Sequence, residues 1–98
     1  MDRPKEEDRE LIEFKELYKS NAPMLIFYAG KYVNAIAAED LVQDVFFKIW
    51  QKRTFLFLKE GIRTYLYRSV QHACLDYLKH QEVKGDYINT VTTQLKIE

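Results

Sequence analysis

The chain has few of the residues that cross-link or interrupt a small protein. Its 98 residues include one cysteine, two prolines and three glycines. A single cysteine, Cys74, excludes an internal disulfide and fits a reducing compartment. So few prolines and glycines favour long helices over a sheet with many turns. A disulfide-stapled fold is therefore excluded, and long helices are favoured over a turn-rich fold.

Long apolar runs are also missing. No stretch approaches the roughly 20 apolar residues that span a bilayer. The first five residues lead into a charged stretch and not into the apolar core of a signal peptide. We therefore expect a cytoplasmic protein with no membrane partner.

Charge is balanced overall but unevenly distributed. Residues 1–50 hold 7 Lys/Arg against 10 Asp/Glu, whereas residues 51–98 hold 8 against 5. This asymmetry suggests that the two halves face different partners. The content of 47% hydrophobic and 31% charged residues is that of a globular domain.

The N-terminal third predicts two helical stretches with a break between them. Residues 6–20 place several apolar side chains on one side of a charged helix. Asn21 and Pro23 then predict a restart, because asparagine caps helices and proline is tolerated in a first turn. The second stretch continues to Val33, and Asn34 is the predicted stop.

Two stronger helices are predicted at about 37–53 and 62–83. In the first, about 100° per residue separates a core stripe from an opposite polar face that carries one large aromatic ring, Phe47. The polar face consists of Asp40, Gln43, Asp44, Phe47 and Gln51, with Trp50 at its boundary. In the second helix one face carries Tyr65, Arg68, Ser69, His72, Asp76 and Lys79. Residues 54–61 are predicted to be a partly buried connection.

The predicted fold is an all-α, compact bundle of three to four helices. One domain covers residues 1–83, and residues 84–98 are a frayed tail or the start of an interdomain linker. The predicted core consists of Phe14, Leu17, Leu25, Phe27, Leu41, Val45, Phe46, Ile49, Leu66, Val70, Ala73 and Tyr77.

Two motifs resemble a known family. The stretch from Ala38 to Trp50 resembles the signature helix of extracytoplasmic-function sigma factors, with its acidic-Asp-Leu-x-Gln-acidic-x-Phe order ending in tryptophan. Residues 63–70 and 74–78 resemble the DNA-reading helix of sigma region 2 in the same family. The resemblance covers roughly residues 8–82. It implies a sigma factor domain that acts in transcription initiation, with no cofactor and no enzymatic activity.

The resemblance implies a role for each strong helix. The signature helix of the family docks on the clamp helices of the RNA polymerase β′ subunit. The matching positions here are Asp40, Gln43, Asp44, Phe47 and Trp50. An exposed ring beside an amide and two carboxylates also suits a binding hot spot. The alternative is a solvated polar face with an incidental phenylalanine.

The family's third helix and the loop before it recognise and melt the −10 promoter element by binding its non-template single strand. Such binding needs cations for phosphates and flat rings for bases. The candidate DNA-binding residues are Arg53, Lys59, Arg63, Tyr65, Arg68, Ser69, His72 and Lys79. His72 stands where the family commonly has asparagine, and the apolar 55–58 stretch differs from its polar loops, so base preference is open. The −35-reading domain of full-length members is not in this chain, and an anti-sigma protein is a further candidate partner.

Other functions fit less well. His72, Asp76 and His80 share a helix face, but no second cluster of ligands accompanies them, so we expect no metal site. A helix-turn-helix domain would need a short glycine-containing turn between two helices. The serious alternative is a helical protein–protein interaction module or regulator without DNA binding.

Overall fold

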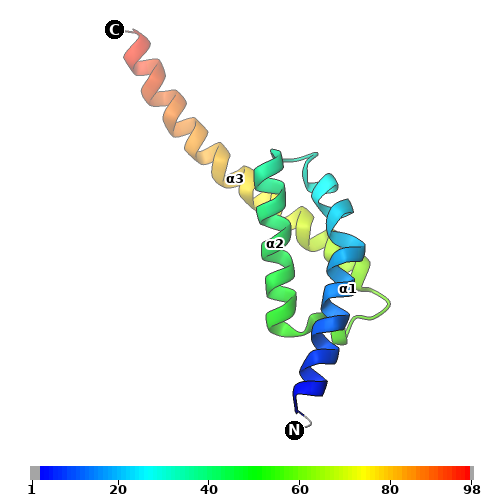
Figure 1. Cartoon of the computed structure of the whole chain (residues 1–98). Helices are drawn as coiled ribbons and strands as arrows, with labels where there is room; N and C mark the ends of the chain where they lie inside the picture. Colours follow the sequence, from blue (N-terminus) through cyan, green and yellow to red (C-terminus); the bar gives the residue numbers. More distant parts are fainter. Residues whose placement is uncertain (1–2, 98) are drawn as a thin grey trace.

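The computed structural model describes the backbone of residues 3–97 and the side chains of residues 6–81. Three α-helices, α1 (Arg3–Ala29), α2 (Ala35–Lys52) and α3 (Ile62–Ile97), are joined by turns and a 3₁₀ helix, η1 (Thr54–Leu56). Helices α1 and α2 run antiparallel side by side, and α3 crosses behind both (Figure 1). Residues 3–97 contain no strand, and the predicted all-α class is confirmed.

Helix α2 agrees closely with the sequence pattern. Three residues of the predicted core, Val45, Phe46 and Ile49, are buried on this helix, and Val42 is buried beside them. Asn34, predicted to end the preceding helix, instead caps the start of α2, because its side-chain Oδ1 accepts a hydrogen bond of 2.8 Å from the Ala37 amide. An asparagine next to an apolar stretch can serve either end of a helix, and the local sequence does not distinguish them.

Helix α1 corrects the predicted break at residues 21–23. The helix is continuous, and Asn21 does not cap it but donates a hydrogen bond of 2.9 Å to the Leu17 carbonyl. Pro23 removes one backbone donor, yet Ala22 and Leu25 on either side are buried in the core. The burial of these flanking residues favours a continuous helix over a restart.

The continuous helix also corrects one predicted core residue. With the helical phase carried through Pro23, Phe27 lies about 140° around the axis from the buried Ala22. Its side chain is 67% exposed, so the prediction that it belongs to the core is wrong. Ala22, Leu25 and Ala29 form the buried stripe instead.

Aromatic rings hold α1, α2 and η1 together. The Phe14 ring lies 6.1 Å from Phe46, 5.1 Å from Trp50 and 5.6 Å from Phe55, measured between centroids. Phe55 is 3% exposed, which confirms that the 54–61 connection is partly buried. These contacts pack η1 and the C-terminal part of α2 against α1.

Helix α3 packs through Leu66, Val70 and Cys74, all fully buried. It continues to Ile97, although the sequence pattern predicted the loss of helix after Val83. No proline follows Pro23 in the sequence, so no residue interrupts the backbone hydrogen bonds. The side chains of residues 84–98 lie outside the described residues, and their assignment to a linker stays a prediction.

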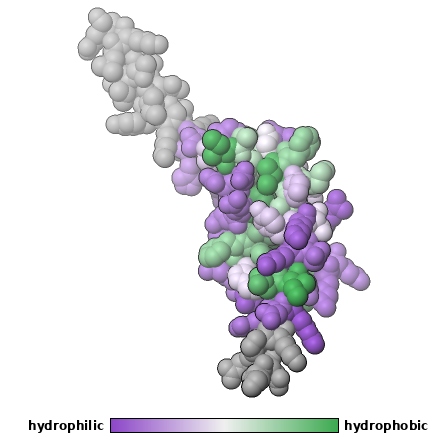
Figure 2. All heavy atoms as spheres, viewed as in Figure 1, coloured by the Kyte–Doolittle hydropathy of each residue, from purple (hydrophilic) through white to green (hydrophobic). Residues whose placement is uncertain are grey.

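Apolar side chains also reach the surface. On the face shown in Figure 2 they form separate groups divided by hydrophilic residues. In the described part of the chain, no helix is both long and apolar enough to cross a membrane.

Candidate functional site

The polar face of α2 is exposed as the sequence predicts. Asp40, Gln43 and Asp44 are exposed, and Phe47, which follows them on the same face, has a side chain that is 57% exposed. Their i, i+3, i+4 and i+7 spacing places them on one side of the helix, while the opposite side is buried. The helix therefore presents one ring together with two carboxylates and an amide.

Trp50 has a different environment from the rest of this set. Its ring stacks on Phe55 with an interplanar angle of 10° and a centroid distance of 6.1 Å. It also contacts Phe14. Trp50 is half-buried and stabilises the packing of α2 against α1 and η1.

Arg53, a predicted DNA-binding residue, is engaged within the fold. It follows α2 in the left-handed conformation, with φ 55° and ψ 31°, and its backbone N–H donates to the carbonyls of Ile49 and Trp50. The guanidinium donates to Glu10 Oε1 at 3.0 Å and to the Trp50 carbonyl, and lies 3.8 Å from the Trp50 ring centroid. The geometry thus gives Arg53 a structural role at the end of α2.

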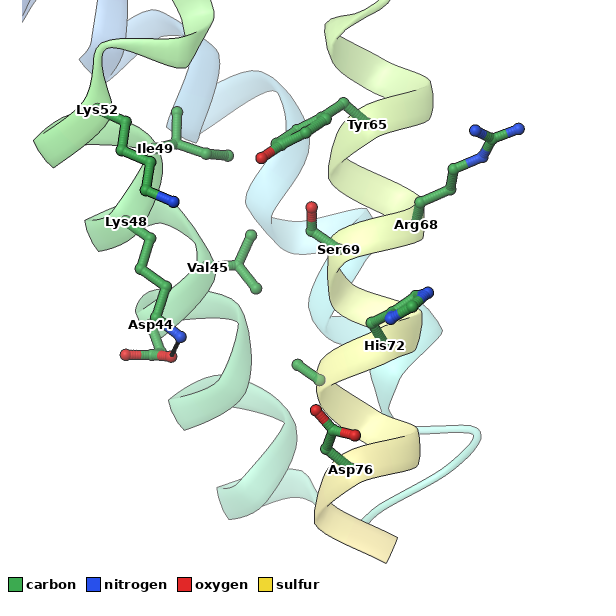
Figure 3. Close-up of a pocket in the computed structure, with 11 residues that line it drawn as sticks. Asp44, Val45, Lys48, Ile49, Lys52, Tyr65, Arg68, Ser69, His72 and Asp76 are labelled. Atoms are coloured by element: carbon green, nitrogen blue, oxygen red, sulfur yellow. Dashed lines mark ion pairs between the residues drawn. The ribbon is translucent and has the colours of Figure 1, made fainter. Parts of the chain in front are cut away.

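An open groove of about 510 Å³ runs between α2 and α3 (Figure 3). One wall comes from α2, the other comes from α3, and small apolar side chains form its floor. It is lined by Asp44, Val45, Lys48, Ile49, Lys52, Tyr65, Arg68, Ser69, His72, Ala73 and Asp76.

The groove brings together four of the predicted DNA-binding residues: Tyr65, Arg68, Ser69 and His72. Tyr65 and Ser69 point toward α2, whereas Arg68 and His72 lie along the outer edge of α3 (Figure 3). The α3 face therefore offers hydroxyl groups inside the groove and a cation and an imidazole at its rim.

Other predicted DNA-binding residues lie elsewhere. Lys59 lines a second groove, of about 440 Å³, together with Glu13 and Glu16 of α1. Arg63 and Lys79 are exposed and line neither of these grooves. The groove between α2 and α3 therefore includes four of the eight predicted positions.

Two lysines of α2 also lie in the groove. Lys52 is one of the basic residues that the sequence places around the start of the DNA-binding face, whereas Lys48 is not among the predicted site residues. Lys48 and Lys52 lie about 100° and 140° around the helix from Phe47, toward the stripe that packs on α3. Lys48 Nζ pairs with Asp44 Oδ2 at 3.2 Å, and both side chains are more than half exposed. The helical phase alone could have indicated that these lysines lie between the polar face and the core.

Two side chains, those of Tyr28 and Cys74, have raised pKa values. The hydrogen bond with the Tyr32 hydroxyl, 3.3 Å away, and burial raise the pKa of Tyr28. Burial raises the pKa of the Cys74 thiol. Among the described residues, no three His, Cys, Asp or Glu side chains gather closely enough to hold a metal ion.

The family comparison agrees with this arrangement of helices. The family model described as Sigma-70 region 2 matches residues 17–83, which include the C-terminal half of α1, all of α2 and the packed part of α3. The chain belongs to the sigma-70 region 2 family. No curated protein and no solved structure shows significant similarity to it. Membership gives the domain a sigma-factor role in RNA polymerase binding and promoter recognition, in a family that is not enzymatic.

Proposed function

We propose that this sigma-70 region 2 domain is of the extracytoplasmic-function type. It docks on the clamp helices of the polymerase β′ subunit through α2, and it captures the non-template strand of the −10 element through α3. The order of residues from Ala38 to Trp50 supports the subtype. The polar face of α2 and the groove-lining face of α3 support the two roles.

The observation that carries the docking proposal is the environment of Phe47. A phenylalanine that is 57% exposed gains little from the fold, and here it is accompanied by Asp40, Gln43 and Asp44 on the same face. A partner can fully desolvate this exposed ring, while the carboxylates beside it pair with basic side chains opposite.

The docking face can be tested with paired substitutions. Phe47→Ala should weaken binding to a β′ clamp-helix fragment by at least tenfold, because a buried aromatic anchor contributes about 2 kcal/mol or more. Asp44→Arg should weaken it as well, by placing a cation against basic partner residues. Both variants should keep the helical circular dichroism of the parent, with affinities measured by calorimetry.

The matched controls lie on α1. Phe27→Ala removes a ring that is even more exposed than that of Phe47, and Asp8→Arg reverses a charge outside the docking face. Each should change the affinity less than twofold. If Phe47→Ala behaves like Phe27→Ala, the docking face has been assigned wrongly.

The DNA-binding face is tested with polymerase present. Arg68→Ala should lower the affinity of the polymerase complex for single-stranded non-template −10 DNA by roughly fivefold, whatever the sequence, because a phosphate-binding cation is lost. His72→Ala should alter the preference among bases more than the overall affinity, because an imidazole both hydrogen-bonds and stacks. Fluorescence anisotropy with a panel of strands measures both effects.

Arg9→Ala on α1 is the control for loss of one exposed positive charge. A protein–protein module without a DNA role would show no salt-sensitive binding of the strand in any variant. That result would replace the DNA-binding half of the proposal with the interaction module.

A further inference from the structure

The groove between α2 and α3 contains a wall that the proposed function does not use. We infer that Lys48 and Lys52 of α2 form a phosphate-binding site for the single strand whose bases α3 contacts. The inference rests on the proposed function, since it concerns the same strand. It adds α2 to the DNA-binding surface, so that one helix contacts both polymerase and promoter.

The geometry places the two lysines opposite hydroxyl groups. Lys48 and Lys52 lie one helical turn apart on the α2 wall, and Tyr65 and Ser69 point toward them from α3 (Figure 3). Ammonium and hydroxyl groups are common donors to the phosphates of nucleic acids. A strand that enters this groove would therefore meet donors from both sides.

The floor of the groove suits the less polar parts of a strand. Val45 and Ile49, which are 7% and 2% exposed, lie beneath the lysines, and Ala73 lies on the α3 side. None of these side chains offers a hydrogen bond. The polar recognition in the groove therefore comes from its walls, and the cations on the α2 wall are these two lysines.

Charge within the groove is polarised along its length. Lys52, Tyr65 and Arg68 lie toward one end, and Asp44 and Asp76 lie toward the other (Figure 3). Among the described residues, Lys52 has no ion-pair partner. A phosphate is therefore expected nearest to Lys52, and the strand should leave the groove before it reaches Asp76.

Lys48 already has a partner, but an exchangeable one. Its ion pair with Asp44 joins two side chains that are 65% and 55% exposed, and such solvated pairs are weak. Asp44 also belongs to the proposed docking face. When a basic residue of the polymerase binds Asp44, the Lys48 ammonium becomes available to a phosphate.

The lysine site is tested by the salt dependence of binding. The full chain is titrated with a mixed-sequence single-stranded oligonucleotide at several salt concentrations, and the affinity is followed by NMR chemical shifts. Each phosphate contact contributes about 0.7 to the slope of log affinity against log salt for a single strand. Lys48→Gln/Lys52→Gln should therefore lower the slope by about 1.4 and weaken binding about tenfold near physiological salt.

The matched control is Lys15→Gln/Lys19→Gln, which removes the same charge from exposed positions on α1 that do not line the groove. It should change the affinity less than twofold and leave the slope within about 0.3. Circular dichroism checks that both double variants remain helical.

A neutral strand separates phosphate contact from base contact. An oligonucleotide with methylphosphonate linkages keeps its bases but loses its backbone charge. Lys48→Gln/Lys52→Gln should not change the affinity for this strand, whereas His72→Ala should still alter the preference among bases in a panel of such strands. A loss with the lysine variant on the neutral strand would overturn the assignment to phosphates.

Different experimental results would overturn the lysine site and the proposed function. Suppose that Arg68→Ala weakens binding, but Lys48→Gln/Lys52→Gln shows the same slope of log affinity against log salt as Lys15→Gln/Lys19→Gln. The lysine site is then wrong, and the DNA-binding role of α3 stands. If the full chain binds no strand, alone or with core polymerase, both are overturned.

Discussion

Arg53, a predicted DNA-binding residue, also stabilises the end of α2 within the fold. Among the described residues it is the one non-glycine residue with positive φ. The left-handed conformation costs an L-residue about 1–2 kcal/mol. Its ion pair with Glu10 and its contact with the Trp50 ring offset part of this cost.

Substitutions at this position separate the two contributions. Arg53→Gly loses the side-chain contacts but removes the Cβ clash, whereas Arg53→Ala loses the contacts and keeps the clash. We expect Arg53→Ala to be less stable than Arg53→Gly by about 1 kcal/mol. Urea unfolding followed by circular dichroism measures the difference, and equal stability would contradict the left-handed end of α2.

The role of Arg53 was not predictable from its neighbours. Its carboxylate partner, Glu10, lies 43 positions away in the sequence. A basic residue next to other basic residues suggests DNA binding, and only the antiparallel packing of α1 and α2 brings Glu10 beside it. By contrast, the exposure of Phe47 followed from the phase of one helix.

At the scale of the helix, α1 carries a proline within its hydrogen-bonded interior. Pro23 is exposed, so its side chain adds little to packing, and its ring leaves the Lys19 carbonyl without its usual amide donor. The helix is retained because residues on both sides of Pro23 pack into the core.

Pro23→Ala should therefore stabilise the domain. Restoring the backbone donor and removing the steric conflict outweigh the extra conformational freedom of the unfolded chain, which is worth about 0.4–1 kcal/mol. We expect a net gain of about 1–2 kcal/mol in the free energy of unfolding. Thermal unfolding of the two proteins measures it, and a destabilised variant would indicate that α1 is interrupted near residue 23.

The helices were predictable to different degrees for a physical reason. The core stripes of α2 and of the packed part of α3 are uninterrupted, so their periodicity alone determined the buried face. In α1, packing decides whether the helix continues or restarts, because Asn21 and Pro23 are compatible with a helix start and also with a helix interior. The wrong prediction that Phe27 is buried followed from the predicted restart at residues 21–23.

The whole molecule determines what the groove contains. The α2 wall and the α3 wall belong to segments whose separate patterns suggested separate partners. Their packing places Lys48 and Lys52 opposite Tyr65 and Ser69. No pattern within either segment specifies that pairing, so the candidate site could be predicted only one helix at a time.

Cys74 reports on the integrity of the whole core. Its side chain is fully buried, and burial raises the pKa of its thiol above the ordinary value of 9.0. Alkylation should therefore require unfolding, and its rate in native protein at pH 8 should be lower than in urea-unfolded protein by orders of magnitude. Comparable rates in the two states would show that the core opens locally.

The raised pKa also predicts the direction of a pH effect. The folded state binds the thiol proton more tightly than the unfolded chain. The associated stability is therefore fully present below the unfolded pKa and is lost as pH rises through 9.0 toward the folded pKa. Above pH 9.0, the free energy of unfolding should fall more steeply with pH in the parent than in Cys74→Ala. Urea unfolding across the pH range measures this difference.

The ion pair between Asp44 and Lys48 has a consequence for the evolution of the sequence. One member lies on the face proposed to meet the polymerase and the other on the groove proposed to hold the promoter strand. A substitution selected for its effect on one surface thus changes the charge of the other. In diverging descendants of this gene, neutral replacements of Asp44 should accompany changes at Lys48, and the two surfaces should evolve as a linked pair.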